Sequence, residues 1–569
     1  MKRIFLSLIA GALAALAIWY GVRISEKTSH AVVSALLPRE TIFVAHVPDF
    51  TQTRDQWHHS DIYQIYREPT VQDFLRKPLA RLPKTAATAQ TLQEIEQLDP
   101  KDAFVALISI DNNNPRFAGG FRFRGSQDAA EAIVGKWRAK LLEKNPAAKR
   151  EKVAYQQHQI ETIAAAAFTL ATAYDGHWFF ASNDVTELKA LLDRTDRHSK
   201  DPQGTLDGGE SYRAAAAHMP SSYAAFFYLQ PKAFADKLAS LRAAIGQRIT
   251  PDQRTMVEKV RGICGTTRFE NGKIRDVIFV GMPKLEQDTT LDRSSLTLAT
   301  KDTFFYLAML LNLGQKIDTI HQTAGIGGRV QQLFQTLSAN GITADDWKAA
   351  FGLELGSFAD WPANARWPSL LLALPVKDTT KASQIVEALT KVDEDATWTR
   401  MEKNGVHYFS MQSPASFVPI TPSFALSNRI LVAGLDRVSV EEVMKRAGIS
   451  AADLSNSQVY SAAAGSVPVP TNFFAYVDTA LLYSRLDATL RPMLLMSAAF
   501  MPKMNDYVDV SKLPAPEAIT KHLSPIVSSQ RYERDGYMAE SVGPVTLNQA
   551  AIGLGLPAAF WAIGWQRGR

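Results

Sequence analysis

Short runs of apolar residues recur along the chain, separated by turn residues and by longer amphipathic stretches. Runs such as 42–47 and 103–110 have the length of strands, whereas 127–142 and 377–392 have the spacing of amphipathic helices. Several strand pairs are joined by Asn-Gly or Asp-Gly, which favour tight hairpins because both residues adopt positive φ at little cost. A long strand-helix-strand series with phosphate-binding glycines does not occur in the sequence. The pattern predicts an α+β fold with mainly antiparallel sheets and packed helices.

The order of these segments in the first half of the chain recurs in the second half, which is typical of an internal duplication. The matching segments, in chain order, are 37–44 with 299–306, 103–142 with 369–392, 168–192 with 423–446, 211–229 with 459–477, and 267–280 with 530–542. We therefore predict two tandem pseudo-equivalent α+β repeats, 33–283 and 295–544, joined by a linker at 284–294. A concave sheet face, or the seam between the repeats, is where we expect a ligand or partner to bind.

The N-terminal segment 4–22 is apolar and carries no formal charge. As a helix its 19 residues would extend about 28 Å, close to the thickness of one hydrocarbon core. Lys2 and Arg3 precede it and favour a cytoplasmic N-terminus. Residues 1–30 are therefore predicted to be an N-terminal transmembrane helix, or signal-anchor, with a short tether. This places the chain in the inner membrane, with its bulk on the periplasmic side. A cleaved signal peptide is the alternative, although the small-residue triplets lie inside the apolar run.

The C-terminal segment 545–569 contains a second uncharged apolar run at 550–565. Its length is sufficient for a second transmembrane helix, and Arg567 and Arg569 would suit a cytoplasmic end. Pro557 and the polar residues before the run weaken that interpretation. A terminal helix packed on the body and a second span both remain open.

Composition narrows the class of protein. Of the 569 residues, 46% are hydrophobic and 21% charged, which is typical of a globular chain of more than one domain. The net charge of +5 is spread along the sequence without a basic block, so nucleic acid is not expected as a partner. A single cysteine, Cys264, excludes a disulfide within the chain and a zinc site of several cysteines. We interpret Cys264 as a small buried apolar residue.

No group of residues forms a catalytic, cofactor-binding or metal-binding signature, so we predict no such site residues and no cofactor. His58 and His59 are adjacent and point in different directions, which suits a solvated helix start capped by Ser60 or Asp61 better than a metal site. Three other stretches resemble known motifs only superficially. They are predicted to be a hairpin turn at 111–115, which lacks the carboxylates of a calcium loop, and flexible connections at 204–209 and 325–328.

One predicted amphipathic helix carries basic residues beside its apolar ones. Residues 65–82 place Phe74 and Leu79 beside basic residues such as Arg76 and Lys77. This pattern is compatible with a helix lying on an anionic membrane surface. The favoured interpretation is an ordinary helix that faces the protein core.

Residues 36–41 with the strand 42–47, and residues 540–544 near the end, resemble the corresponding parts of a family of bacterial membrane-anchored envelope proteins, a domain of unknown function. The resemblance implies an uncharacterised extracytoplasmic protein and brings no catalytic residues. We therefore predict a non-enzymatic binding or scaffold module of the cell envelope, with an envelope protein, a lipid or a cell-wall component as its partner. Two alternatives remain. One is an envelope hydrolase with a site assembled from distant residues, and the other is an accessory subunit of a transport or secretion complex.

Overall fold

The structure is a computed structural model. It describes residues 33–81, 86–111, 114–166, 168–196, 204–233, 255, 257–284, 289–310, 328–391, 396–412, 421–447, 454–501 and 504–549. The predicted N-terminal helix at 4–22 and the apolar run at 550–565 lie outside these residues.

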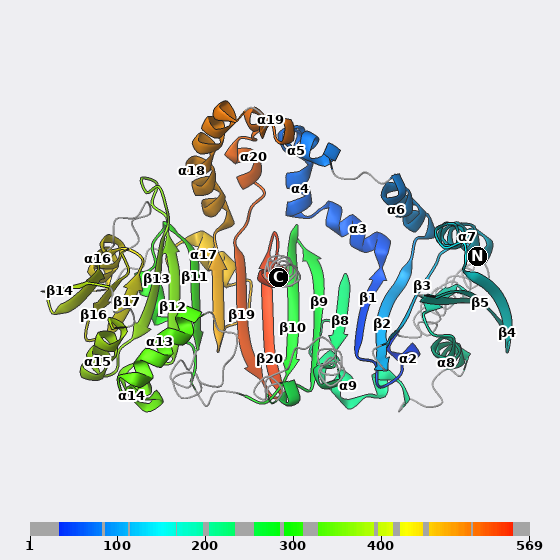
Figure 1. The fold of residues 1–569 in the computed structure, drawn as a ribbon, viewed down its shortest axis with the longest axis horizontal. Helices are drawn as coiled ribbons and strands as arrows, with labels where there is room; N and C mark the ends of the chain where they lie inside the picture. Colours follow the sequence, from blue (N-terminus) through cyan, green and yellow to red (C-terminus); the bar gives the residue numbers. More distant parts are fainter. Residues whose placement is uncertain are drawn as a thin grey trace, which may run out of the picture.

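The described strands form one sheet of 20 strands in which every pairing is antiparallel (Figure 1). In the first half the neighbours run in the order β4 (Lys149–Tyr155), β5 (His158–Ala165), β6 (Phe168–Asp175), β7 (Trp178–Ser182), β3 (Asn114–Arg122), β2 (Lys101–Asp111), β1 (Phe43–Asp49), β8 (Ala225–Leu229), β9 (Gly262–Glu270), β10 (Lys273–Gly281). The second half continues with β20 (Gly536–Gly543), β19 (Ile526–Glu533), β18 (Phe473–Val477), β11 (Thr303–Leu310), β12 (Glu354–Asp360), β13 (Ser369–Pro375), β17 (Ile430–Gly434), β16 (Ser423–Leu426), β15 (Val406–Met411), β14 (Trp398–Lys403).

The two halves have the same strand order, and they meet at the pairing of β10 with β20. In this seam Val277 lies opposite Glu540, so an approximate two-fold axis passes near that pair. The prediction of separate sheets in two tandem repeats is therefore wrong, because the strands form one continuous sheet. The physical reason is that β10 and β20 would otherwise be exposed edge strands with unpaired backbone groups, and each covers the other. Descent of the halves from a duplication stays a prediction.

One face of the sheet carries the two central cores. In the first half it packs against α2 (Val33–Leu36), α8 (Val185–Asp196) and α9 (Glu210–Ala216). In the second half it packs against α16 (Arg437–Arg446) and α17 (Gln458–Ala464). Tyr228 and Tyr306 are among the largest fully buried side chains of these cores. Aromatic side chains of this size each bury a large apolar area.

The opposite face is covered mainly at its two ends. In the first half, a core around Ile133 and Phe179 holds α7 (Gln127–Lys144) against the sheet. In the second half, a core around Ile385 and Leu431 holds three helices against the sheet: α13 (Gly328–Ala339), α14 (Ala344–Ala350) and α15 (Thr379–Leu389). The middle of this face lies between these two helical layers.

Helices from both halves form an arch beyond one end of the central strands (Figure 1). The first half supplies α3 (Phe50–His58), α4 (Asp61–Arg67), α5 (Pro69–Arg81) and α6 (Ala86–Leu98), and the second half supplies α18 (Thr479–Phe500), α19 (Met504–Tyr507) and α20 (Pro516–Thr520). Polar contacts join the two sides of this arch: Glu68 with Lys521 at 2.8 Å and His522 at 2.7 Å, Asp73 with Lys512 at 2.8 Å, and Arg81 over the ring of Tyr507 at 4.1 Å.

The arch corrects the interpretation of residues 65–82 as one core-facing helix. The segment is divided at Glu68 into α4 and α5, because Pro69 begins a new helix and disfavours helical backbone at the residue before it. Only Val71 of α5 is buried. Most of α5 is therefore not part of a core, and its contacts with the second half hold the arch together.

The prediction that the chain is anchored in the inner membrane by one or two transmembrane helices is also corrected. Among the helices of the described residues, none is both long enough and apolar enough to cross a membrane. The 22-residue α18 comes closest in length, but it carries Arg485, Asp487 and Arg491 and a proline in its interior. Charged side chains in the middle of a span are costly in hydrocarbon.

The predicted hairpins occur, with two shifts of register. Asp175 pairs with Trp178, so the bend after β6 lies at Gly176 and His177 instead of at the Asp-Gly pair. The turn at Asn271 and Gly272 has φ of 51° and 82°, as expected for an Asn-Gly turn. In the equivalent hairpin of the second half, Glu533 pairs with Gly536, so the bend lies at Arg534 and Asp535 instead of at the Asp-Gly pair. Gly536 is instead a strand residue at the seam.

Candidate binding surface

The middle of the less covered sheet face is apolar. Successive side chains of a strand point to opposite faces, and directly paired residues on neighbouring strands share a face. In the first half, Phe43 pairs with Leu107 and Leu229, and Leu107 pairs with Phe117. The next row, two residues along, consists of Phe227, Ala45, Val105 and Gly119.

The second half has matching rows on the same face. They are Val477, Phe305, Ala359 and Leu370, followed by Ala475, Leu307, Ser357 and Leu372. We call the apolar rows of both halves the trough. Several of its side chains are far from buried: Val105 is 50% exposed, Phe117 42%, Leu370 45% and Leu372 42%. Val105 and Phe117 form one exposed apolar patch in the first half, and Leu370 and Leu372 form another on the same face in the second half. Exposed apolar patches are typical of binding sites.

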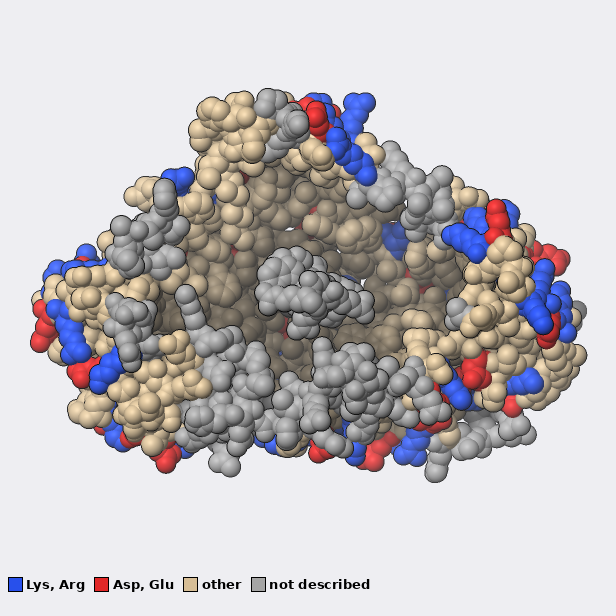
Figure 2. Space-filling model, in the orientation of Figure 1, with Lys and Arg blue, Asp and Glu red and all other residues tan. Residues whose placement is uncertain are grey.

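The trough faces the hollow side of the molecule. It lies on the same face as α13 and α14, because Leu431 in their core pairs with Leu374, two residues from Leu372. These helices stand in front of the sheet in Figure 1. Figure 2, in the same orientation, shows this side hollowed below the arch, with the charged residues gathered around its periphery.

A polar pocket lies where the trough meets the arch in the first half. We call it the α3 pocket, and its volume is about 550 Å³. Two adjacent residues from each of two successive turns of α3 contribute to its wall, and the tip of the β9–β10 hairpin closes it from the other side. Its lining residues are Asp49, Thr51, Gln52, Asp55, Gln56, His59, Arg124, Phe269, Asn271 and Gly272.

Local hydrogen bonds fix this pocket. Asp49 caps α3 by accepting a hydrogen bond from the backbone N–H of Gln52 at 2.9 Å. Its other oxygen lies 3.3 Å from Lys101 and 3.9 Å from Arg124. Ser60 caps the N-terminus of α4, and the N–H of Asp61 donates to the carbonyl of Gly272 at 2.7 Å, which ties the hairpin tip to the arch. The pocket is therefore part of the framework of the fold.

Most of the residues that the sequence singled out do not form a site. Ser60 caps a helix as predicted, His58 packs against Tyr63 with ring centres 4.6 Å apart, and His59 lies in the α3 pocket. Cys264 is fully buried and donates to the carbonyl of Ala215. Burial raises the pKa of this thiol to about 12, so it stays protonated and unreactive.

The remaining sequence motifs resolve in a similar way. Asp111 pairs with Asn114 across the β2–β3 hairpin, as predicted for a turn. Within the residues that the structure describes, no group of three or more His, Cys, Asp or Glu side chains could hold a metal ion. Gly325 and Gly327 lie outside those residues, and Gly328 begins α13.

Sequence reasoning missed His46, which the fold places beside Tyr223 and Asp102. Its Nδ1 lies 3.2 Å from the Tyr223 hydroxyl and its Nε2 lies 3.5 Å from an Asp102 oxygen. Burial raises the pKa of Tyr223 to about 12, which makes the hydroxyl a poor nucleophile at neutral pH. Asp102 is also held by Arg122 at 2.8 Å. The three groups lack the activated nucleophile that hydrolysis requires.

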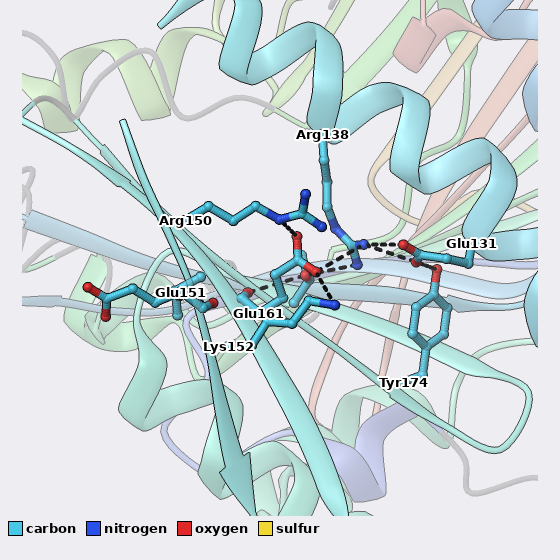
Figure 3. A network of polar contacts seen from close by, with 9 residues as sticks. Glu131, Arg138, Arg150, Glu151, Lys152, Glu161 and Tyr174 are labelled. Carbon is cyan, nitrogen blue, oxygen red and sulfur yellow. Dashed lines mark hydrogen bonds and ion pairs between the residues drawn. The ribbon is translucent and has the colours of Figure 1, made fainter. Parts of the chain in front are cut away.

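A second polar cluster lies between α7 and the outer strands of the first half (Figure 3). Arg138, only 5% exposed, donates two hydrogen bonds to Glu131 and one to Thr172, and it lies 3.6 Å from Glu161. Arg150 reaches the same Glu161 at 2.7 Å. Glu131 and Glu161 are each paired with arginine, and removal of one partner from such a buried pair is destabilising, so the cluster has a structural role in the packing of α7.

A buried carboxyl group lies near the centre of the trough face. Asp276 accepts hydrogen bonds from Thr267, Thr546 and Gln549. Burial is the main cause that raises the pKa of Asp276, and the three hydrogen bonds oppose it. The group therefore fixes the described end of the chain to the sheet.

Comparisons with known proteins leave the chain without a family. No family model matches it, and no curated protein matches it. Among solved structures, crystal forms III and IV of TP0453 are similar over 45% and 44% of this chain and 81% and 79% of theirs. The sequence identity is 6% and the TM-score 0.25 in both cases. Similarity this weak assigns neither a fold family nor a function to the chain. The resemblance to envelope proteins stays a prediction.

Proposed function

We propose that this chain is a non-enzymatic binding module whose ligand-binding surface is the trough. The observation that carries the proposal is the exposure of Val105, Phe117, Leu370 and Leu372, which lie on one hollow face and come from both halves of the sheet. Binding of an apolar ligand is favourable when it removes exposed apolar area of this kind from water.

The backbone of the trough supports this proposal over a role as a site for strand addition. The strands that form its floor are each paired on both sides, so their N–H and C=O groups are already satisfied. Among the described strands, β4 and β14 are the edge strands, and each lies four strands away from the trough strands β3 and β13. A ligand over these strands would therefore meet side chains, most of them apolar, and no unpaired backbone groups of the floor. The alternatives of a hydrolase and of a transport or secretion subunit gain no specific support from the described residues.

A pair of matched valine substitutions tests the proposal. Val105 in the trough and Val153 on the edge strand β4 are both strand valines, 50% and 46% exposed. We expect V105K to weaken binding of the apolar fluorescent probe N-phenyl-1-naphthylamine about tenfold or more. The bound probe would cover the lysine charge, and removing that charge from water costs more than ~1.4 kcal/mol of binding free energy. V153K should bind the probe like the unmodified chain. Equal probe binding by V105K and V153K, or no binding by the unmodified chain, would contradict the proposal.

A further inference from the structure

The polarity of the trough changes along β1 in the direction of the arch. Phe43, Ala45, Val47 and Asp49 share one face of the strand, which extends about 20 Å from the first to the last at 3.3 Å per residue. The neighbouring strand β2 repeats the change, since these positions pair with Leu107, Val105, Ala103 and Lys101. An apolar floor therefore runs directly into the polar α3 pocket.

The α3 pocket presents both signs of charge. Asp55 and Arg124 line it, and the side chain of each is 57% exposed. Asp55 is paired with Arg54 at 3.2 Å. Arg124 is paired with Asp99 at 3.1 Å and lies 3.9 Å from Asp49. A carboxylate and a guanidinium each have further oxygens or N–H groups able to bond a ligand. A head group with one positive and one negative charge complements this pair better than a group with a single charge.

We propose that the trough binds a single-chain zwitterionic amphiphile, a conclusion that rests on the proposed function. Its hydrocarbon chain lies over Val47, Ala45 and Phe43, and its head group enters the α3 pocket with the anionic part toward Arg124 and the cationic part toward Asp55. A hydrocarbon chain suits this floor because it has no polar groups to satisfy. An extended peptide would bury backbone N–H and C=O groups against side chains that cannot bond them.

Calorimetric titration with three amphiphiles of equal chain length, each below its micelle concentration, tests the assignment. They are lysophosphatidylcholine, which is zwitterionic, the corresponding fatty acid, which is anionic, and the monoacylglycerol, which is neutral. We expect the lysophosphatidylcholine to bind at least tenfold more tightly than the other two. Equal binding of all three would overturn the assignment of the head group.

Two variants, D55N and R124Q, separate the pocket from the trough. Each is expected to weaken lysophosphatidylcholine binding about tenfold, the value for one lost charge-assisted hydrogen bond. Neither should change the monoacylglycerol or the naphthylamine probe. R116Q on β3, which lies outside the pocket and pairs with Asp111 and Asp184, is the control.

The outcomes distinguish the two proposals. Loss of lysophosphatidylcholine selectivity in D55N and R124Q, with unchanged probe binding, supports the amphiphile. Unchanged selectivity in both variants overturns it while the trough remains a binding surface. Failure of the unmodified chain to bind both the probe and the amphiphiles overturns the proposed function as well.

Discussion

Replacing Arg138 by methionine is expected to lower the free energy of unfolding by about 3 kcal/mol, the low end for breaking a buried ion pair. Methionine keeps most of the apolar stem and removes the guanidinium, which donates to Glu131 and Thr172. The loss stays at the low end because Glu161 keeps Arg150 as a partner. Denaturant unfolding, followed by the shift of its midpoint, measures the effect.

Arg150 supplies the matched control. It contacts the same Glu161 at 2.7 Å, but its side chain is 48% exposed. A pair with one partner this accessible to water contributes about 1 kcal/mol or less, so R150M should shift the midpoint only slightly. If R138M and R150M proved equally stable, the cluster in Figure 3 would not stabilise the packing of α7.

Substitution of Gly536 by alanine is expected to destabilise the seam between the halves by about 1–3 kcal/mol, as overpacking of a close contact does. A Cβ atom at this position would clash with the carbonyl oxygen of Val280 and would lie 2.6 Å from the ring of Phe279. The first contact is with backbone of the partner strand, so relief requires β10 and β20 to separate. Thermal unfolding of G536A measures the loss.

Gly135 offers a control with the opposite sign. It lies within α7, and the nearest atom to an added Cβ is a Glu131 carboxylate oxygen at 3.6 Å. Alanine is the better helix former by about 1 kcal/mol, so G135A should unfold at the same or a higher temperature. Equal destabilisation by G536A and G135A would contradict a close-packed seam.

Local turn chemistry was predictable from the sequence, and long-range packing was not. Asn271 and Gly272 form the turn that their sequence indicates, because both adopt positive φ. Gly536 follows an aspartate and suggests the same turn, yet it lies in a strand where the backbone of Val280 approaches. Only the fold reveals that a close contact, and not a bend, requires this glycine.

The single sheet could not be predicted because its joining contact links distant residues. Val277 and Glu540 meet in the seam, and neither the apolar pattern of β10 nor that of β20 specifies a partner. Pattern reasoning identifies each strand from its own residues and from nearby turns. The pairing that merges the halves follows from tertiary packing.

The trough was predicted only in general terms, as a concave sheet face that could bind a ligand. The β2 sequence is apolar on both faces, with Ala106 and Ile108 in the core and Val105 and Leu107 on the trough side. Such continuous apolar runs are typical of strands covered on both faces. The exposure of Val105 depends on which helices cover the sheet. The arch helices lie beyond the ends of the strands instead of over the middle of the sheet, so they leave Val105 exposed.

Photolabelling tests the central claim most directly. The full chain would be irradiated with a fatty-acyl lysophosphatidylcholine that carries a diazirine in its chain, digested, and analysed by mass spectrometry for the labelled residues. The trough predicts label on β1 and β2, centred on Phe43 and Val105, and loss of that label in V105K but not in V153K. Label concentrated on the exposed side chains of α18, such as Met496 and Phe500, or on the edge strand β4, would contradict the trough as the binding surface.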